Sequence, residues 1–245
     1  MATDAFFKIL DSVDSTNNYA MAKVRAGMAK HGMAFAAIEQ TDGKGQRGKS
    51  WQTQPGQNIA MSLILKTDKL RVDEQFYLSM LVALAANDFL NKYLSKETFI
   101  KWPNDLYWRD RKAGGVLIET VFKGTAWKWA VVGIGINVNQ TRFHKSLPNP
   151  VSIKQVTHQT YDVMELAKQL YELVMKRMDL LAAKSTDKTI KEYNRHLYKL
   201  NQKVKLKKAS AVFETTIKHV SLQGQLHTMD AMERQFDFGE VEWVL

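Results

Sequence analysis

Apolar side chains between residues 73 and 94 recur every three or four positions, which is the spacing of one face of an α-helix. Two later segments, residues 162–183 and 186–200, repeat this spacing. The polar segment DSTN and the later Gly27 mark the two ends of one more helix, which we expect to begin at Ser15 or Thr16. The residues that mark the face of the first helix are Phe76, Met80, Leu81 and Leu84.

Compact or alternating apolar runs predict β-strands between these helices. Glycines or charged turns separate the runs, as expected for neighbouring strands of a sheet. Helices and strands in this mixed order predict an α+β fold. The predicted strand segments are residues 6–10, 33–40, 58–66, 98–108, 112–122 and 127–139.

The pattern changes at Asn201, where short alternating segments follow one another with tight turns at Ser210 and Gly224. These segments read VKLKK, VFETTIKHV, QLHTMD, RQFDF and EVEWV. They predict a small all-β domain over residues 201–245, with five strands arranged as a barrel. The larger α+β domain is expected over residues 1–200.

Composition excludes several classes of chemistry. The chain has no cysteine, so disulfides, thiol catalysis and cysteine-ligated metal centres are ruled out. The start of the chain is too charged for a signal peptide, and no window approaches the roughly 20 apolar residues that span a bilayer. We therefore expect a cytoplasmic protein with no membrane partner.

Lysine and arginine exceed aspartate and glutamate by 35 − 25 = 10. Part of this excess lies in residues 184–218, which hold ten basic and three acidic residues. Such a balance suits a nucleic acid, an acidic protein partner or a polyphosphate substrate. The six histidines show no metal-ligand spacing.

Residues 43–51 read GKGQRGKSW, and the first eight match the phosphate-loop pattern G-x-x-x-x-G-K-[ST]. A phosphate loop needs a helix directly after it, because the helix N–H groups hold the phosphates. Here Pro55 and Gly56 would stop a helix in its second turn, and an alternating strand follows. We therefore expect a glycine-rich loop between two strands, able to approach a ligand closely.

Two further segments are candidates for a site. The segment KWPNDL begins at Lys101 and turns at Pro103, so that Asn104 and Asp105 lie at a defined turn. The segment GIGIN, which ends at Asn137, lacks the third glycine and the helix of a dinucleotide fingerprint. By itself it is a weak signal.

Taken in order, these segments resemble the motifs of the biotin protein ligases. That family carries D-S-T-N, G-R-G-R-x-G-R-x-W, K-W-P-N-D-L, K-x-x-G-[IV]-L-x-E and G-x-G-[IL]-N. The resemblance covers nearly the whole chain, and the pairing of KWPNDL with DSTN is its most specific part. The matching segments are DSTN (14–17), GKGQRGKSW (43–51), KWPNDL (101–106), KAGGVLIE (112–119) and GIGIN (133–137).

The resemblance implies a class II synthetase-like mixed sheet with flanking helices, followed by an SH3-like β-barrel. It implies an enzyme that joins biotin to ATP as biotinyl-5′-AMP and then transfers biotin to a lysine of a biotin carboxyl carrier protein domain. Mg²⁺ is the expected cofactor, and a homodimer is compatible with the family. Repressor function and specific DNA binding are not expected, because the motifs begin at Asp14 and leave no room for a helix-turn-helix domain of roughly 60 residues.

The resemblance also implies a role for each site residue. Cations must offset the repulsion between the biotin carboxylate and the α-phosphate, and Lys112 matches the catalytic lysine, with Lys101 in support. The neutral ureido end of biotin needs hydroxyl and amide partners. The residues that match biotin positions are Ser15, Thr16, Asn17, Gln40, Gly43, Lys44 and Gly115. Those that match ATP and adenylate positions are Gln46, Arg47, Lys49, Trp51, Asn104, Asp105 and Asn137, with Asp105 also expected to contact the metal.

The glycine-rich loop departs from the family pattern, because Lys44, Gln46 and Lys49 stand where the pattern has arginine. Lysine keeps the charge but loses the bidentate fork, and Gln46 loses the charge. In the family this loop closes over the adenylate and shields it from water. Our hypothesis is that this chain holds its adenylate less tightly, or that Arg47 substitutes.

Two other functions stay open. A lipoate or octanoate ligase shares the fold and the acyl-adenylate chemistry, although the chain has no G-G-G-x-V-x-H-D loop. A non-catalytic nucleic-acid-binding protein would suit the basic segment 184–218, although no RNA-binding aromatic signature accompanies that segment.

Overall fold

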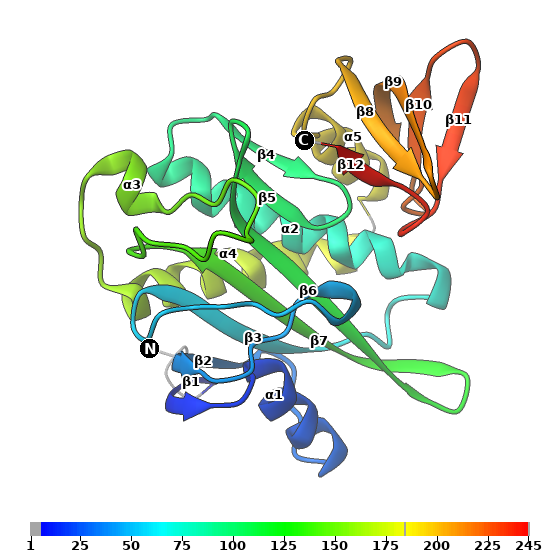
Figure 1. Cartoon of the computed structure of the whole chain (residues 1–245). Coiled ribbons are helices and arrows are strands. Elements are labelled where there is room, and N and C mark those ends of the chain that lie inside the picture. The colour runs from blue at the N-terminus through cyan, green and yellow to red at the C-terminus, as the bar shows by residue number, and fades with distance from the viewer. Residues whose placement is uncertain (1–5, 184, 245) are drawn as a thin grey trace.

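The structure is a computed structural model that describes residues 6–183 and 185–244. Its larger part is built on a seven-stranded sheet in the order β1-β2-β3-β7-β6-β5-β4 (Figure 1). β1 and β2 are parallel, whereas the other neighbours are antiparallel, so the sheet is mixed. The strands are β1 (Phe7–Val13), β2 (Met33–Gln40), β3 (Asn58–Lys66), β4 (Thr98–Lys101), β5 (Asp105–Trp108), β6 (Arg111–Lys123) and β7 (Ala126–Asn137).

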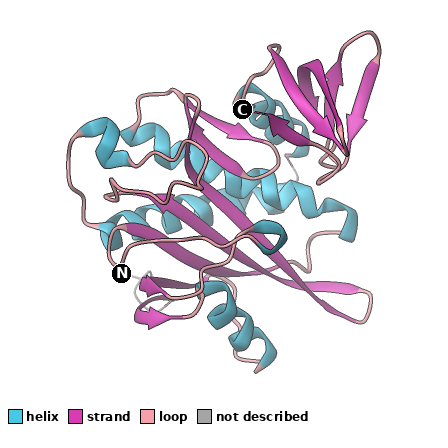
Figure 2. Ribbon diagram, viewed as in Figure 1, coloured by secondary structure: helices cyan, strands magenta, loops and turns pink. Residues whose placement is uncertain are grey.

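Helices cover both faces of this sheet, because successive side chains of a buried strand point to opposite sides. On one face α1 (Thr16–Arg25) buries Ala20 and Val24 against Phe35 and Val131. On the other face α2 (Gln75–Tyr93) and α4 (Val163–Ala183) form the main core, as the layers in Figure 2 show. α2 carries the predicted apolar face, and its central turns are almost completely buried.

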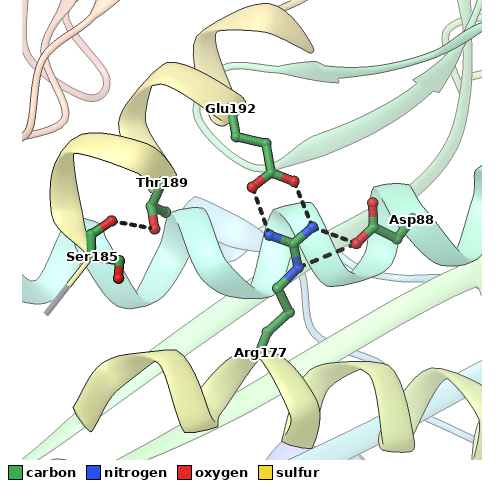
Figure 3. A network of polar contacts seen from close by, with 5 residues as sticks. All are labelled: Asp88, Arg177, Ser185, Thr189 and Glu192. Atoms are coloured by element: carbon green, nitrogen blue, oxygen red, sulfur yellow. Dashed lines mark hydrogen bonds and ion pairs between the residues drawn. The ribbon is translucent and has the colours of Figure 1, made fainter. Parts of the chain in front are cut away.

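An ionic network joins α4 to α2 and to α5 (Thr186–Arg195) (Figure 3). The guanidinium of Arg177 donates to Glu192 at 2.6 and 2.9 Å and to Asp88 at 2.5 Å. These hydrogen bonds hold the pKa of Glu192 below its usual value, chiefly through Arg177, and hold the pKa of Arg177 above its own. The network fixes α5, which leads the chain toward its C-terminal part.

Five antiparallel strands follow, in the order β11-β10-β9-β8-β12. They share the main core through Leu206 and Ile217, and the indole of Trp102 donates to Gly224 O at 2.8 Å. This small sheet therefore packs directly against the larger part, next to α5 in Figure 1. Its strands are β8 (Lys203–Lys208), β9 (Ala211–Val220), β10 (Leu226–Met229), β11 (Glu233–Phe236) and β12 (Glu242–Val244).

The predicted α+β class, the mixed sheet with flanking helices and the five C-terminal strands are confirmed. The predicted helix over 186–200 is too long, because it ends at Arg195 and the next residues pair with β4 through Ile100 and Leu197. The domain boundary at residue 200 and closure of the small sheet into a barrel stay predictions. Short helices that the sequence did not predict are η1 (Gln46–Gly48), η2 (Val72–Glu74) and α3 (Ile153–Thr157).

Within residues 6–183 and 185–244, no helix has the combination of length and hydropathy that a bilayer crossing requires.

Candidate functional site

A cavity of about 810 Å³ lies at the meeting point of the large sheet, the glycine-rich loop and the small C-terminal sheet. It is lined by every predicted site residue except Gly43. The roles assigned to these residues stay predictions. The predicted residues in the lining are Ser15, Thr16, Asn17, Gln40, Lys44, Gln46, Arg47, Lys49, Trp51, Lys101, Asn104, Asp105, Lys112, Gly115 and Asn137.

Gly43 lies behind the cavity surface and shapes it through its backbone. Its carbonyl accepts a hydrogen bond from Trp51 N at 2.7 Å. A side chain at this position would meet the backbone of Trp51 and would approach Gln40 Nε2 to 2.8 Å. Gly43 therefore allows the two ends of the glycine-rich loop to lie close together.

The glycine-rich loop joins two strands, as the sequence predicts, and the helix that a phosphate loop requires is not there. Lys44 and Ser50 form an isolated antiparallel bridge, and Gly45 N donates to Lys49 O at 2.7 Å. The single turn η1 at its tip holds Arg47 at a φ of 55°. Arg47 Nη1 donates to Gly239 O at 3.4 Å, so the loop contacts the small C-terminal sheet.

One end of the cavity is cationic. Lys112 Nζ lies 2.5 Å from Asp105 Oδ1, and both side chains are partly exposed. Lys101 is only 8% exposed. Burial lowers its pKa to about 8; Asp105 opposes that shift, and the charges of Lys112 and Lys49 add to it. The turn of KWPNDL thus brings one carboxylate and several lysines together.

The small C-terminal sheet supplies some of the side chains around the Lys101 ammonium group. Lys101 Nζ lies 3.1 Å from Tyr107 Oη and 5.3 Å from the ring of Trp243 on β12. Phe238 and Val241 line the same cavity. Sequence reasoning missed these three C-terminal residues, because they follow the last motif by about 100 positions and their alternation indicates only a packed sheet.

Trp51 lies against β7. A Cβ atom on Gly135 would overlap the Trp51 indole, with Cζ2 only 2.6 Å away. Lys112 Nζ lies 5.9 Å from the centre of the Trp51 ring. The second glycine of GIGIN therefore leaves the space that the indole fills, beside the cationic end of the cavity.

The two predicted asparagines are held by backbone contacts. Asn137 Nδ2 donates to Lys112 O at 3.3 Å and to Val151 O at 3.1 Å. Asn104 Nδ2 donates to Val116 O at 2.5 Å. Since both amide nitrogens are engaged, each side chain offers its oxygen, an acceptor, to a ligand.

The other end of the cavity carries neutral polar groups. Gln40 Oε1 accepts from Thr16 N at 2.8 Å, and it lies 2.9 Å from Thr16 Oγ1. Behind them, Ser62 Oγ lies 2.7 Å from Thr16 Oγ1 and 2.5 Å from Asn17 Oδ1. Sequence reasoning missed Ser62, since a lone serine within an apolar strand carries no motif.

Metal ligands are sparse in this part of the molecule. Among the described residues, no group of three or more histidine, aspartate or glutamate side chains could hold a metal ion. Of the described carboxylates, Asp105 and Glu242 line the cavity. A metal bound here would therefore need oxygen ligands from a phosphate-bearing substrate as well.

The biotin/lipoate A/B protein ligase family model matches residues 9–137, which is more than half of the chain. The bifunctional ligase/repressor BirA of Escherichia coli (strain K12) is 33% identical over 141 residues, covering 58% of this chain and 43% of BirA. The biotin–[acetyl-CoA-carboxylase] ligase of Mycobacterium tuberculosis is 30% identical over 135 residues, covering 54% of this chain and 49% of that protein. These matches span half or less of the relatives' length.

Solved structures extend the likeness to the whole chain. The structure of the biotin protein ligase from Aquifex aeolicus in complex with biotin and ATP has a TM-score of 0.81. It covers 96% of this chain and 97% of that one, at 23% identity. At this identity the likeness establishes the fold, including the small C-terminal sheet.

Proposed function

Because this chain belongs to the biotin/lipoate A/B protein ligase family, we propose that it is an ATP-dependent ligase that activates biotin and attaches it to a lysine of a biotin carboxyl carrier protein domain. The observation that carries this proposal is the distribution of neutral polar and cationic groups in the cavity described above. Neutral hydrogen-bonding groups occupy one end, and Lys101, Lys112 and Lys49 occupy the other. Such a cavity suits a ligand with an uncharged polar head and an anionic tail.

In the first step, a carboxylate oxygen of biotin attacks the α-phosphorus of ATP. The bond to the bridging oxygen breaks, and pyrophosphate leaves with its electron pair. Two anions must approach each other, so fixed cations at the site of attack lower the barrier. Lys112 and Lys101 are the groups that we expect to do this, because both line the cationic end of the cavity.

The adenine ring is expected to stack on the Trp51 indole, whose position beside Gly135 leaves it in the cavity lining. Asn137 would accept a hydrogen bond from the adenine amino group, since its own amide nitrogen is engaged with backbone carbonyls. Lys49 and Arg47 would lie near the phosphates.

The oxygens that could hold Mg²⁺ are those of Asp105 and Asn104, and they suit a cation that keeps phosphate and water ligands. Asn104 Nδ2 donates to Val116 O, which leaves its Oδ1 available. When bound, the ion would reduce the negative charge of the phosphates. The residues of the chain position the reacting groups.

In the second step, the neutral ε-amine of a carrier lysine attacks the carbonyl carbon of the biotinyl adenylate. The amide bond forms, AMP leaves, and the ammonium proton passes to solvent or to the leaving phosphate. Water must stay out until the lysine arrives. We expect the glycine-rich loop to provide this cover, since it lines the cavity and its Arg47 Nη1 donates to Gly239 O of the C-terminal part.

The test is mass spectrometry after incubation of the protein with MgATP and equal amounts of biotin, lipoate and octanoate. We expect biotinyl-AMP as the single adenylate, and transfer of its biotin when a carrier domain is added. Lipoyl- or octanoyl-AMP in its place would assign the chain to the other branch of the family. No adenylate at all would contradict the proposal.

A further inference from the structure

Tyr107 on β5 is a buried residue of the cavity lining that the steps above do not use. Its side chain is 1% exposed, and its hydroxyl oxygen lies 3.1 Å from Lys101 Nζ. In the sheet, Tyr107 is the direct partner of Lys112 on β6. Directly paired residues of antiparallel strands have neighbouring side chains on one face of the sheet. Tyr107 therefore adjoins both lysines that line the cationic end of the cavity.

The direction of the hydrogen bond between Lys101 and Tyr107 follows from the chemistry of the two groups. An ammonium group has hydrogens but no lone pair, so Lys101 donates and the Tyr107 oxygen accepts. The phenol hydrogen must then point elsewhere. Among the residues that the structure describes, no group accepts it. A buried donor without an acceptor is costly, so a ligand oxygen at this point gains a hydrogen bond that the empty cavity lacks.

The ring of Tyr107 is held in place by its neighbours. Its centre lies 5.0 Å from the ring of Tyr198 and 4.9 Å from Lys101 Nζ. Tyr198 is itself anchored, because its hydroxyl donates to Asp110 Oδ1 at 2.8 Å. The Tyr107 hydroxyl is therefore a fixed donor, and the hydrogen bond that it accepts from Lys101 polarises it and strengthens its own donation.

We propose that Tyr107 is a catalytic residue whose hydroxyl donates a hydrogen bond to a non-bridging oxygen of the ATP α-phosphate during adenylate formation. The inference rests on the proposed function, which places the attack on the α-phosphorus beside Lys101 and Lys112. Because Tyr107 adjoins both lysines, its free hydrogen is available at that point. No covalent bond to Tyr107 forms or breaks, and its proton stays on the phenol oxygen throughout.

A fixed neutral donor adds a directional contact to the charges of the lysines. An ammonium group attracts any anionic oxygen nearby, whereas an O–H group on a fixed ring favours one oxygen in one direction. The non-bridging oxygens move around phosphorus as the carboxylate enters and pyrophosphate leaves. A donor directed at their position in the transition state stabilises that state more than it stabilises bound ATP, so it raises the rate more than the affinity.

Tyr107→Phe removes the hydroxyl and keeps the buried ring, so it tests the donor alone. We expect the single-turnover rate of adenylate formation at saturating biotin and MgATP to fall roughly 10- to 100-fold, as for the loss of one preorganised donor. The Kd for biotin, measured by titration calorimetry, should change little, because the neutral end of the cavity keeps all its groups. A rate equal to that of wild type would overturn the proposal.

Tyr198→Phe is the matched control. It removes a buried tyrosine hydroxyl from the same group of aromatic rings, but Tyr198 lies outside the cavity lining. Asp110, its partner, keeps an ion pair with Lys199 at 2.6 Å. Adenylate formation by this variant should stay close to the wild-type rate. An equal loss in both variants would assign the effect to the packing of the rings and overturn the proposal.

Phosphorothioate substrates distinguish a direct contact with the α-phosphate from an effect that passes through Lys101. In each of the two diastereomers of ATPαS, sulfur replaces one non-bridging oxygen, and sulfur accepts hydrogen bonds weakly. We expect Tyr107→Phe to change the rate little with the diastereomer that has sulfur at the contact, and to show its full effect with the other. Equal losses with both diastereomers would overturn the direct contact.

The wild-type reaction separates this inference from the proposed function. A wild type that forms biotinyl-AMP no faster than Tyr107→Phe would overturn the inference and leave the ligase intact. Formation of lipoyl- or octanoyl-AMP that falls in Tyr107→Phe would support the inference and remove biotin as the substrate. A wild type that forms no adenylate from any of the three acids would overturn both.

Discussion

Lys101 is a basic side chain in a buried environment that disfavours its positive charge. The side chain is 8% exposed, and burial lowers its pKa to about 8. A lysine is charged below its pKa, so the charge that is complete at pH 6.5 is lost as the pH rises through about 8. An ordinary lysine would keep that charge up to pH values near 10.5.

We therefore predict an alkaline decline of adenylate formation with an apparent pKa near 8. The reason is that the reacting anions lose one of the cations that offset their repulsion. The measurement is the pH profile of pyrophosphate release at biotin and MgATP concentrations well below their KM values, where the rate reports the ligand-free protein. Lys101→Arg is the matched variant, because arginine stays charged throughout this range. Its maximum rate should be lower, but its profile should stay flat between pH 7 and 9, and a decline near pH 8 in both proteins would exclude Lys101 as the cause.

The sequence predicted the residues of the cavity better than their contacts. The sequence motifs identified the lysines of the cavity and Thr16, because side chains that contact a charged or polar ligand belong to few chemical types. They did not name Ser62 as a partner of Thr16, since only folding brings β3 beside the start of α1. The roles proposed for Gln46 and Arg47 in adenylate retention stay predictions.

The GIGIN segment lies in β7, where its two glycines shape the lining of the cavity. Gly133 and Gly135 are two residues apart, so their missing side chains open the same face of the strand. Asn17 fills the first space and the Trp51 indole fills the second. One strand thus leaves room for groups at both ends of the cavity, which two glycines in a sequence could not reveal.

We predict that Gly135→Ala displaces Trp51 and raises the KM for ATP by roughly tenfold, the loss of one aromatic stacking contact. The KM for biotin should change little, because the neutral end of the cavity is untouched. Steady-state kinetics with each substrate varied in turn provide the measurement. Gly124→Ala, in the turn that joins β6 to β7, meets no atom within 4 Å but strains the backbone at a φ of 62°, so it controls for a weakened hairpin. Equal ATP KM values for Gly135→Ala and wild type would contradict the prediction.

Elements with a strong apolar pattern were predicted well. β2, β3, β7 and α2 are buried on one or both faces, so their periodicity records their packing. The end of the last helix was not predicted, because Ile100 N donates to His196 O and Tyr198 N donates to Ile100 O. These contacts with β4 replace the helical hydrogen bonds, and no local sequence signal anticipates a partner about 100 residues away.

At the scale of the molecule, the small C-terminal sheet completes the environment of Lys101. Trp243 lies 5.3 Å from its ammonium group and lines the same cavity. The sequence predicted a separate β part after residue 200. It did not predict this contact, because the relative placement of two parts of a chain depends on surfaces that no single segment encodes.

We predict that Trp243→Ala moves the alkaline decline of adenylate formation to higher pH. Opening the cavity to water hydrates Lys101, which raises its pKa toward the ordinary value. The pH profile of pyrophosphate release measures the shift. Trp243→Phe keeps an apolar cover and should keep the decline near pH 8. A profile that is unchanged in Trp243→Ala would mean that the small sheet does not govern the charge of Lys101.

The cavity draws its lining from residues as far apart as Ser15 and Trp243. During synthesis a chain emerges from its N-terminal side, so most of the lysines and the Thr16 end exist before β12 has been made. A nascent or prematurely ended chain therefore has a half-built cavity with Lys101 open to water. Under the proposed function, such a copy would keep the charge of Lys101 but would lack part of the cover over the adenylate, so it would lose the intermediate to water before a carrier lysine arrives.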